Sequence, residues 1–322
     1  MTFDIFNIVT VGPEIMILGG ACIILMMDAF RSTPEEENVI IYWFSLIILL
    51  SGCGIIIINL GNNIGSALNG HFFKDTMGDL LKILTYFSVF ISFIYSRVHV
   101  KRCNSLRGEF FILGLFAVLG MSVMISAGSF ITLFMGLELL TLPLYIMAIF
   151  DYDSVLVSKI VVGYFIRGGI SSGILLYGMS LLYGVTGSLN LIQISNIVQK
   201  LSMESTGQNQ ILLIFGTVFI IIGVSFKFGS LPINMWISNI YQDISSVVIL
   251  FLSTIPKLIV FSIIVRLLVG TLDPLIRQWQ QILIVIALFF IVAASSFMVR
   301  RQLLEKNFSV NMKNHISHPS LG

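Results

Sequence analysis

Long apolar segments with few charges constrain this chain more than any other feature of its sequence. A helix needs roughly 20 apolar residues to cross the hydrocarbon of a bilayer. Nine segments meet this condition, at residues 13–30, 39–60, 77–96, 109–127, 129–150, 160–183, 210–240, 246–270 and 279–299. The sequence therefore predicts an all-α polytopic membrane protein with about nine transmembrane helices.

The composition agrees with this class and argues against others. Hydrophobic residues make up 57% of the 322 residues and charged residues only 11%, whereas a soluble domain has about 25% charged residues. The net charge of +2 is too small to indicate nucleic-acid binding. Cys22, Cys53 and Cys103 lack the spacing of a metal or redox site, so we expect neither a metal nor a bound cofactor on this chain.

Two segments depart from a plain helix pattern. Residues 210–240 are longer than one crossing requires, and Gly229 and Pro232 interrupt them, which predicts a broken helix at membrane depth. The polar residues 187–210 before it are expected to stay outside the membrane. At the N-terminus, Asp4 and Glu14 precede the apolar run in place of basic residues, so we expect a retained helix rather than a signal peptide.

The basic residues of the loops predict an orientation. If the nine segments alternate in direction, most lysines and arginines fall on one side of the membrane. These residues are Arg31, Arg97, Lys101, Arg102, Arg107, Arg300, Arg301, Lys306 and Lys313. The opposite side holds only Lys74, Lys200 and Arg277. Because basic loops stay on the cytoplasmic or matrix side, we expect the N-terminus outside and the C-terminus inside.

Four ionisable residues lie deep inside the apolar segments, away from the segment ends, namely Glu138, Arg167, Lys227 and Lys257. Each charge near the bilayer centre costs roughly 2.5–3.5 kcal/mol on insertion scales unless it is paired or hydrated. Residues of this kind in a membrane protein usually mark an ion or proton pathway. The sequence therefore predicts such a pathway in the interior of the helical bundle.

The neighbours of three of these residues favour that interpretation. Pro143 and Pro256 cannot donate a backbone hydrogen bond, so each leaves a carbonyl oxygen free near Glu138 and Lys257 respectively. Lys227 directly precedes the predicted helix break. A buried Glu–Lys pair can hold or release a proton as it closes or opens. The alternatives are a Glu138 that only ties helices together and a Lys257 that extends to the membrane interface.

Several motifs carry a resemblance to one known family. They are Pro13-Glu14, Gly136-Leu137-Glu138-Leu139, Leu176-Tyr177-Gly178, Leu182-Tyr183-Gly184-Val185-Thr186-Gly187, Phe226-Lys227 with Pro232 and Trp236, and Ser253-Thr254-Ile255-Pro256-Lys257. In this order, from about residue 13 to residue 300, they resemble subunit N of NADH-quinone oxidoreductase, called NADH dehydrogenase subunit 2 in mitochondria. The resemblance implies an antiporter-like membrane subunit of respiratory complex I, in a bacterial or mitochondrial inner membrane.

The resemblance also implies roles for individual residues. Glu138 and Lys227 correspond to the pair thought to gate the family's proton path, and Lys257 to the lysine that passes the proton toward the centre of the subunit. NAD, FMN, iron–sulfur clusters and quinone are expected on other subunits. The expected partners are the other membrane-arm subunits and the lipid bilayer, with no nucleic acid.

The sequence departs from the family pattern at several functional positions. Gly163 stands where the family usually has a lysine in the sixth span, and Asn234 and Asn239 stand where it has a histidine and an aspartate. Lys159 and Arg167 lie one turn before and after Gly163 on the same helix face. We hypothesise that one or both supply the missing cation. Arginine stays protonated in proteins, so Arg167 can tune the local field but cannot carry a proton.

The family continues into a second, inverted repeat beyond the end of this chain. We therefore expect three regions: an N-terminal three-helix region (1–108), a first five-helix antiporter-like repeat (109–270), and the ninth helix with the truncated start of the second repeat (271–322). A second chain would then supply the missing helices. Two alternatives stay open, a shortened non-pumping structural paralogue and a subunit of a multi-subunit cation/proton antiporter.

Overall fold

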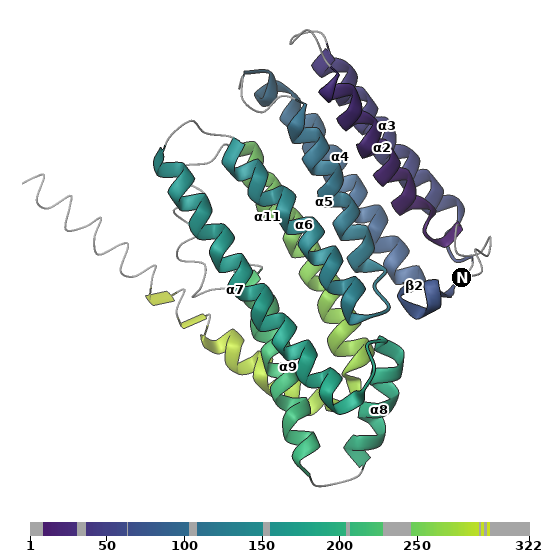
Figure 1. Ribbon diagram of the computed structural model, residues 1–322, viewed down its shortest axis with the longest axis vertical. Coiled ribbons are helices and arrows are strands. Elements are labelled where there is room, and N and C mark those ends of the chain that lie inside the picture. Colours follow the sequence, from purple (N-terminus) through teal and green to yellow (C-terminus); the bar gives the residue numbers. More distant parts are fainter. Residues whose placement is uncertain are drawn as a thin grey trace, which may run out of the picture.

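A computed structural model describes residues 9–30, 37–62, 64–102, 108–150, 155–203, 207–227, 246–289, 291–292 and 295–296. Nearly all of these residues are helical, and the long helices lie side by side as a bundle (Figure 1). The prediction of an all-α polytopic membrane protein is confirmed. The helices are α2 (Gly12–Ala29), α3 (Glu37–Ile58), α4 (Thr76–Arg102), α5 (Glu109–Ile125), α6 (Phe130–Phe150), α7 (Val155–Thr186), α8 (Leu191–Met203), α9 (Gln208–Lys227) and α11 (Ser246–Ile263).

Six of the described helices are long and apolar enough to cross a membrane, and a bent pair raises the number to seven. The bent pair joins Lys257–Thr271 to Asp273–Phe289 at an angle of 87°. It includes a π-helical turn, η3 (Ile264–Thr271), which continues α11, and a short 3-10 helix, η4 (Asp273–Leu275). The count of nine spans stays a prediction, and the predicted break at Gly229 and Pro232 lies outside the described residues.

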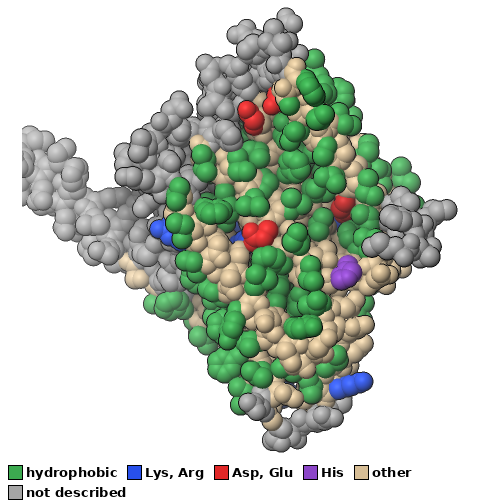
Figure 2. Space-filling view, viewed as in Figure 1, with side chains coloured by type: hydrophobic (Ala, Val, Ile, Leu, Met, Phe, Trp, Pro, Cys, Tyr) green, Lys and Arg blue, Asp and Glu red, His purple; other side chains and the backbone are tan. Residues whose placement is uncertain are grey.

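The outer surface is mostly apolar. Figure 2 shows hydrophobic side chains over most of the visible face, with charged groups as isolated spots. Many large apolar side chains are exposed along the long helices, including Ile23 on α2, Leu80 on α4 and Ile170 on α7. A soluble protein rarely leaves so much contiguous apolar surface in water, so this surface fits contact with lipid.

A small β-hairpin and a short helix, neither expected from the apolar pattern, lie at one end of the bundle. Strands β1 (Gly65–Ala67) and β2 (Phe72–Lys74) pair antiparallel, with Gly65 opposite Lys74. Helix α8 forms within the polar residues 187–210. The Asn190 side chain starts α8 by accepting hydrogen bonds from two backbone N–H groups of its first turn, as helix N-caps do.

Glycines allow two helix pairs to approach closely. A Cβ atom on Gly136 of α6 would lie 2.8 Å from the backbone nitrogen of Met124 in α5. A Cβ atom on Gly223 of α9 would lie 2.8 Å from the backbone nitrogen of Leu175 in α7. Both spacings are shorter than real Cβ contacts, so a larger residue would push the helices apart. These contacts set the positions of Glu138 on α6 and Lys227 on α9.

Candidate functional site

Lys227 and Glu138 meet as a buried ion pair. Lys227 is the last residue of α9, and its ammonium group donates a hydrogen bond to Oε1 of Glu138 on α6. The Lys227 side chain is 1% exposed and that of Glu138 is 27% exposed. The pair therefore joins two helices with its amine fully enclosed and its carboxylate open to one side.

Ser172 of α7 completes a three-helix contact. Its Oγ lies 2.6 Å from Nζ of Lys227 and 2.6 Å from Oε1 of Glu138. Its Oγ also lies 3.0 Å from the carbonyl oxygen of Gly168. A hydroxyl has a single hydrogen to donate, so Ser172 can donate either to Glu138 or to Gly168 while it accepts from Lys227.

This arrangement gives the hydroxyl of Ser172 two alternative acceptors. In a dry site the ammonium and the carboxylate stabilise one another strongly, because little water screens them. Ser172 can turn its hydrogen from Glu138 to Gly168 and still keep its contact with Lys227.

The helix contact that brings the trio together is itself hydrogen-bonded. Ser171, next to Ser172, donates to the carbonyl oxygen of Gly223 over 2.8 Å. Gly223 lies one turn before Lys227 on α9. The sequence pattern showed Glu138 and Lys227 but not the two serines, because hydroxyl residues are common in membrane helices and carry no charge signal.

Arg167 lies on α7 near the position where the family carries a lysine. The side chain is exposed, and its guanidinium atoms lie 3.6–3.8 Å from the place of a Cβ atom on Gly163. The guanidinium group of Arg167 therefore lies beside Gly163, as expected for two residues four positions apart on one helix. The side chain of Lys159 lies outside the described part of the chain, as do Asn234 and Asn239.

Lys257 makes no described contact with the pair. Its side chain on α11 is exposed, and within the described part of the chain no ion pair or hydrogen bond joins it to Glu138 or Lys227. A cavity of about 270 Å³ lies between α9, α11 with its continuation η3, and the helical segment Asp273–Phe289. Val224 and Ser225 line it just before Lys227, and Val260 lines it one turn after Lys257. The structure brings together two of the three predicted proton-path residues.

A second set of buried charges was missed by the sequence analysis. Glu14, Lys74, Asp79 and Lys82 are all buried at the hairpin end of the bundle. Asp79 and Lys82 fall inside the apolar segment 77–96 and share one face of α4, since residues three apart are neighbours on a helix. That spacing of opposite charges within an apolar segment is the signal that could have revealed them.

The sequence is similar to those of known membrane proteins. Residues 127–306 match the family described as "NADH:quinone oxidoreductase/Mrp antiporter, TM". NADH-quinone oxidoreductase subunit N of Thioalkalivibrio sulfidiphilus is 38% identical over 323 residues, covering 100% of this chain and 66% of the relative. Subunit N of Nitrosomonas europaea is 34% identical over 96% of this chain and 63% of its own length. The chain thus spans slightly less than two thirds of these relatives.

Solved structures share the fold at lower sequence identity. A chain of respiratory complex I from Thermus thermophilus with bound aureothin aligns with a TM-score of 0.64 and 22% identity, over 79% of this chain and 53% of that chain. A chain of the Mrp complex from Dietzia sp. aligns with a TM-score of 0.62 and 18% identity, over 82% and 49%. At these identities the likeness concerns the fold alone.

Proposed function

Because the chain belongs to the transmembrane NADH:quinone oxidoreductase/Mrp antiporter family, we propose that it is a membrane-arm subunit of a proton-pumping NADH:quinone oxidoreductase. In this proposal Glu138, Ser172 and Lys227 form part of an intramembrane proton path. The observation that carries it is the buried contact of these three side chains from three helices. Charged residues buried in a membrane bundle are costly, and they usually mark ion or proton pathways.

The pair works as a proton-loading element. While it is closed, the carboxylate of Glu138 holds Lys227 in its ammonium form. When the pair opens, Lys227 loses that stabilisation in a site almost without water, and the neutral amine becomes favoured. A charge that approaches Glu138 from the rest of the complex opens the pair and so releases the proton. Arg167 adds a fixed positive charge on α7 that biases this opening without itself carrying a proton.

Onward transfer to Lys257 needs water. The cavity between α9 and α11 is lined almost entirely by apolar side chains, and an apolar cavity stays dry unless polar partners hold water in it. In the proposal, release of the Lys227 proton and wetting of this cavity occur together. The wet state connects Val224 and Ser225, next to Lys227, with Val260, one turn after Lys257.

The remaining expectations form part of the same proposal. The redox groups (NAD, FMN, iron–sulfur clusters and quinone) belong to other subunits. The C-terminus faces the cytoplasm or matrix, as the basic loops predict. The host membrane is a bacterial inner membrane or a mitochondrial inner membrane.

A non-pumping structural subunit is the second candidate. It is favoured by the exposure of Lys257 and by Gly163 at the family's lysine position. In that role the ion pair of Glu138 and Lys227 would serve only to fasten α6 to α9. A subunit of a multi-subunit cation/proton antiporter shares the fold but matches the sequence motifs less well.

One experiment separates the two roles. A bacterial strain lacking subunit N receives this chain, together with the C-terminal third of a full-length subunit N on a second plasmid, and inverted membrane vesicles are prepared. Pumping predicts NADH-driven proton uptake that Lys227→Met abolishes and Lys200→Met leaves intact, since Lys200 is exposed on α8. Restored NADH oxidation with no proton uptake by the wild-type chain establishes the structural role instead. Failure to restore either activity refutes membership of the complex.

A further inference from the structure

Arg266 lies near the end of the helix that carries Lys257, and its side chain leaves that helix and enters the hairpin end of the bundle. It belongs to η3, which continues α11, so Arg266 and Lys257 share one continuous helical segment. The Arg266 side chain is only 13% exposed. A guanidinium group stays charged and carries five N–H donors, so it needs acceptors wherever it is enclosed.

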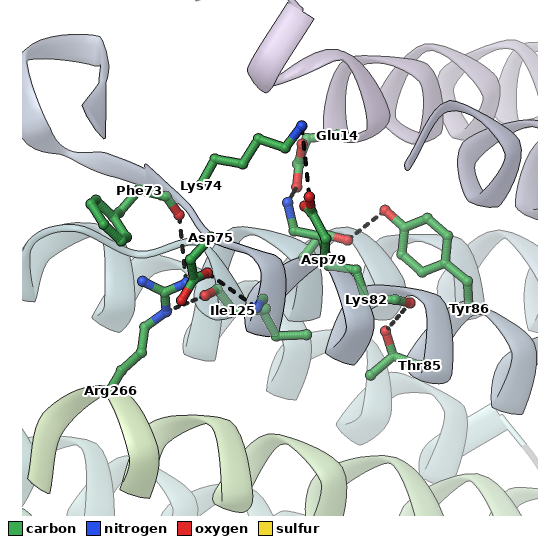
Figure 3. Close-up of polar contacts among 12 residues, drawn as sticks. Glu14, Phe73, Lys74, Asp75, Asp79, Lys82, Thr85, Tyr86, Ile125 and Arg266 are labelled. Atoms are coloured by element: carbon green, nitrogen blue, oxygen red, sulfur yellow. Dashed lines mark hydrogen bonds and ion pairs between the residues drawn. The ribbon is translucent and has the colours of Figure 1, made fainter. Parts of the chain in front are cut away.

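Three acceptors from other segments surround this guanidinium group (Figure 3). Nε donates to the carbonyl oxygen of Ile125, the last residue of α5. Nη2 lies 2.7 Å from Oδ1 of Asp75. It also lies 3.5 Å from the carbonyl oxygen of Phe73 on β2, at the outer limit for a hydrogen bond. Arg266 therefore joins η3 to the end of α5 and to the hairpin.

The charge of Arg266 suits both helix ends that it meets. The last carbonyl groups of a helix lack partners inside it and form the negative end of its dipole, so a cation beside Ile125 stabilises the end of α5. Asp75 also accepts from the backbone N–H of Gly78 in the first turn of α4, over 3.1 Å, and a carboxylate is favoured there. The rigid fork of an arginine can bind several acceptors at once, which a lysine cannot do with the same geometry.

The helical turn around Arg266 is wound as a π-helix and is held from both ends. The backbone N–H of Leu272 donates to the carbonyl oxygen of Leu267 over 2.8 Å, the i→i+5 pattern of a π-helix. After it, the indole N–H of Trp279 donates to the carbonyl oxygen of Leu272 over 3.1 Å. Such turns are rare and often occur at functional sites. The contacts of Arg266 hold the turn on the side of α11, and those of Trp279 hold it beyond the bend.

The anchored end of α11 lies beside the start of the helix that carries Glu138. Ile125 ends α5 and Phe130 begins α6. Between them, Ser126 accepts a hydrogen bond from the backbone N–H of Phe73 over 2.8 Å. Arg266 thus connects the helix of Lys257 to the segment from which α6 starts. Residues of α11 and η3 also line the cavity near Lys227, namely Val260, Ile263, Ile264, Leu267 and Leu268.

We propose that Arg266 is a positioning residue, which fixes α11 with Lys257 and one wall of the cavity against the start of α6. Within the described part of the chain, no ion pair or hydrogen bond joins Lys257 to Glu138 or Lys227. The place of Lys257 relative to that pair therefore depends on how α11 is held, and Arg266 supplies the hold at the hairpin end. Arg266 itself carries no proton, because arginine stays protonated in proteins. The consequence for proton transfer rests on the proposed function.

Electron paramagnetic resonance on the full chain in lipid nanodiscs tests the positioning directly. After the native cysteines are replaced by serine, one pair of spin labels is placed at two exposed residues, Leu142 on α6 and Thr254 on α11. A reference pair is placed at exposed Ile170 on α7 and Phe215 on α9. We expect Arg266→Met to shift or broaden the distances of the first pair and to leave the reference pair unchanged.

A second variant keeps both charges and covers the case in which Arg266→Met does not fold. A Cβ atom on Gly78 would clash with Oδ1 of Asp75 and lie 3.0 Å from Nη2 of Arg266, so Gly78→Ala displaces the pair. We expect the same change between α6 and α11. The control is Gly54→Ala on α3, because no atom lies within 4 Å of that Cβ position.

Two results of the spin-label measurement overturn the proposal. If the distances between α6 and α11 in Arg266→Met and Gly78→Ala equal those of the wild-type chain, Arg266 does not hold α11. If the reference pair changes as much as the first pair, the variants have lost packing throughout the bundle, and Arg266 has no specific positioning role.

Vesicles of the complemented strain test the consequence for proton transfer. Arg266→Met should lower NADH-driven proton uptake by about tenfold or more, since a misplacement of about 1 Å can cost this much in a positioned site. The exposed Arg277 supplies the control, and Arg277→Met should keep the uptake. Unchanged uptake in a variant whose α11 has moved overturns the role of Arg266 in transfer. If the wild-type chain takes up no protons, the proposed function fails, while the spin labels still decide whether Arg266 positions α11.

Discussion

Replacing Lys227 by methionine removes the amine of the buried pair and leaves Glu138 without its cation. Breaking a buried ion pair by removing one partner typically costs 3–5 kcal/mol, because the remaining charge stays poorly solvated. Glu138 is 27% exposed and keeps a hydroxyl donor in Ser172, so it recovers part of its solvation. We therefore expect Lys227→Met to lower the free energy of unfolding by about 3 kcal/mol, at the lower end of that range.

Removing the other partner of the pair, by Glu138→Gln, should lower the free energy of unfolding more. Glu138→Gln leaves the amine of Lys227 at 1% exposure without its carboxylate. In the folded state this amine must either stay charged without a partner or lose its proton, so we expect a loss of up to about 5 kcal/mol. The double variant removes both charges, and neutral replacement of a buried pair is often close to neutral for stability. Its loss should therefore be smaller than the sum of the single losses by at least about 3 kcal/mol.

Unfolding of the purified variants in mixed micelles, titrated with a denaturing detergent and followed by circular dichroism, gives the three free energies. Lys200→Met serves as the control, because an exposed lysine should change stability by only about 0.5 kcal/mol. Losses below about 1 kcal/mol for both single variants, or additive losses in the double variant, would refute the coupling of Lys227 to Glu138.

Three further predictions concern the helix contacts and Arg167. Gly223→Ala forces α7 and α9 apart and should cost about 1–3 kcal/mol of stability in the same titration, together with part of the proton uptake. Asp75→Asn removes the charged partner of Arg266, so amide hydrogen exchange in η3 should accelerate severalfold, as measured by mass spectrometry. Arg167→Leu should lower the number of protons taken up per NADH oxidised in complemented vesicles.

Two of these changes have a matched control, and all three have a contrary outcome. Gly173 has open space around its Cβ position, so Gly173→Ala should leave the stability equal or higher. Arg277 is exposed, and Arg277→Leu should preserve the proton yield. Equal stability of the two alanine variants argues against tight packing at Gly223. Unchanged exchange in η3 shows that Asp75 does not anchor it, and an unchanged yield in Arg167→Leu removes that residue from the path.

The sequence predicted the membrane class and one buried pair because both rest on strong local signals. Apolar segments of helical length are visible without any tertiary information, and a charge within such a segment is conspicuous. Glu138 and Lys227 were each identified in this way, and the structure places them in contact. Their roles in proton transfer stay predictions.

The remaining features depend on contacts that no local pattern encodes. The spacing of Asp79 and Lys82 is a local signal of a pair, but only the fold shows that Lys82 contacts Glu14 of a different helix. The hairpin has strands of three residues each, too short to give an alternating pattern. The exposure of Lys257 likewise follows from how α11 packs, which its neighbours Ser253 and Pro256 do not determine.

The backbone links at the hairpin end also limit how the bundle can move. The backbone N–H of Phe73 donates to the carbonyl oxygen of Ser126, that of Gly128 to His71, and that of Leu191 to Gly128. These hydrogen bonds join β2, the α5–α6 turn and the start of α8 into one unit. Helices joined at one end in this way can move mainly by tilting about that end. When a helix tilts in this way, the displacement of its residues grows with their distance from the joined end. A small tilt of α6 against its neighbours therefore displaces Glu138 more than the residues at the start of α6.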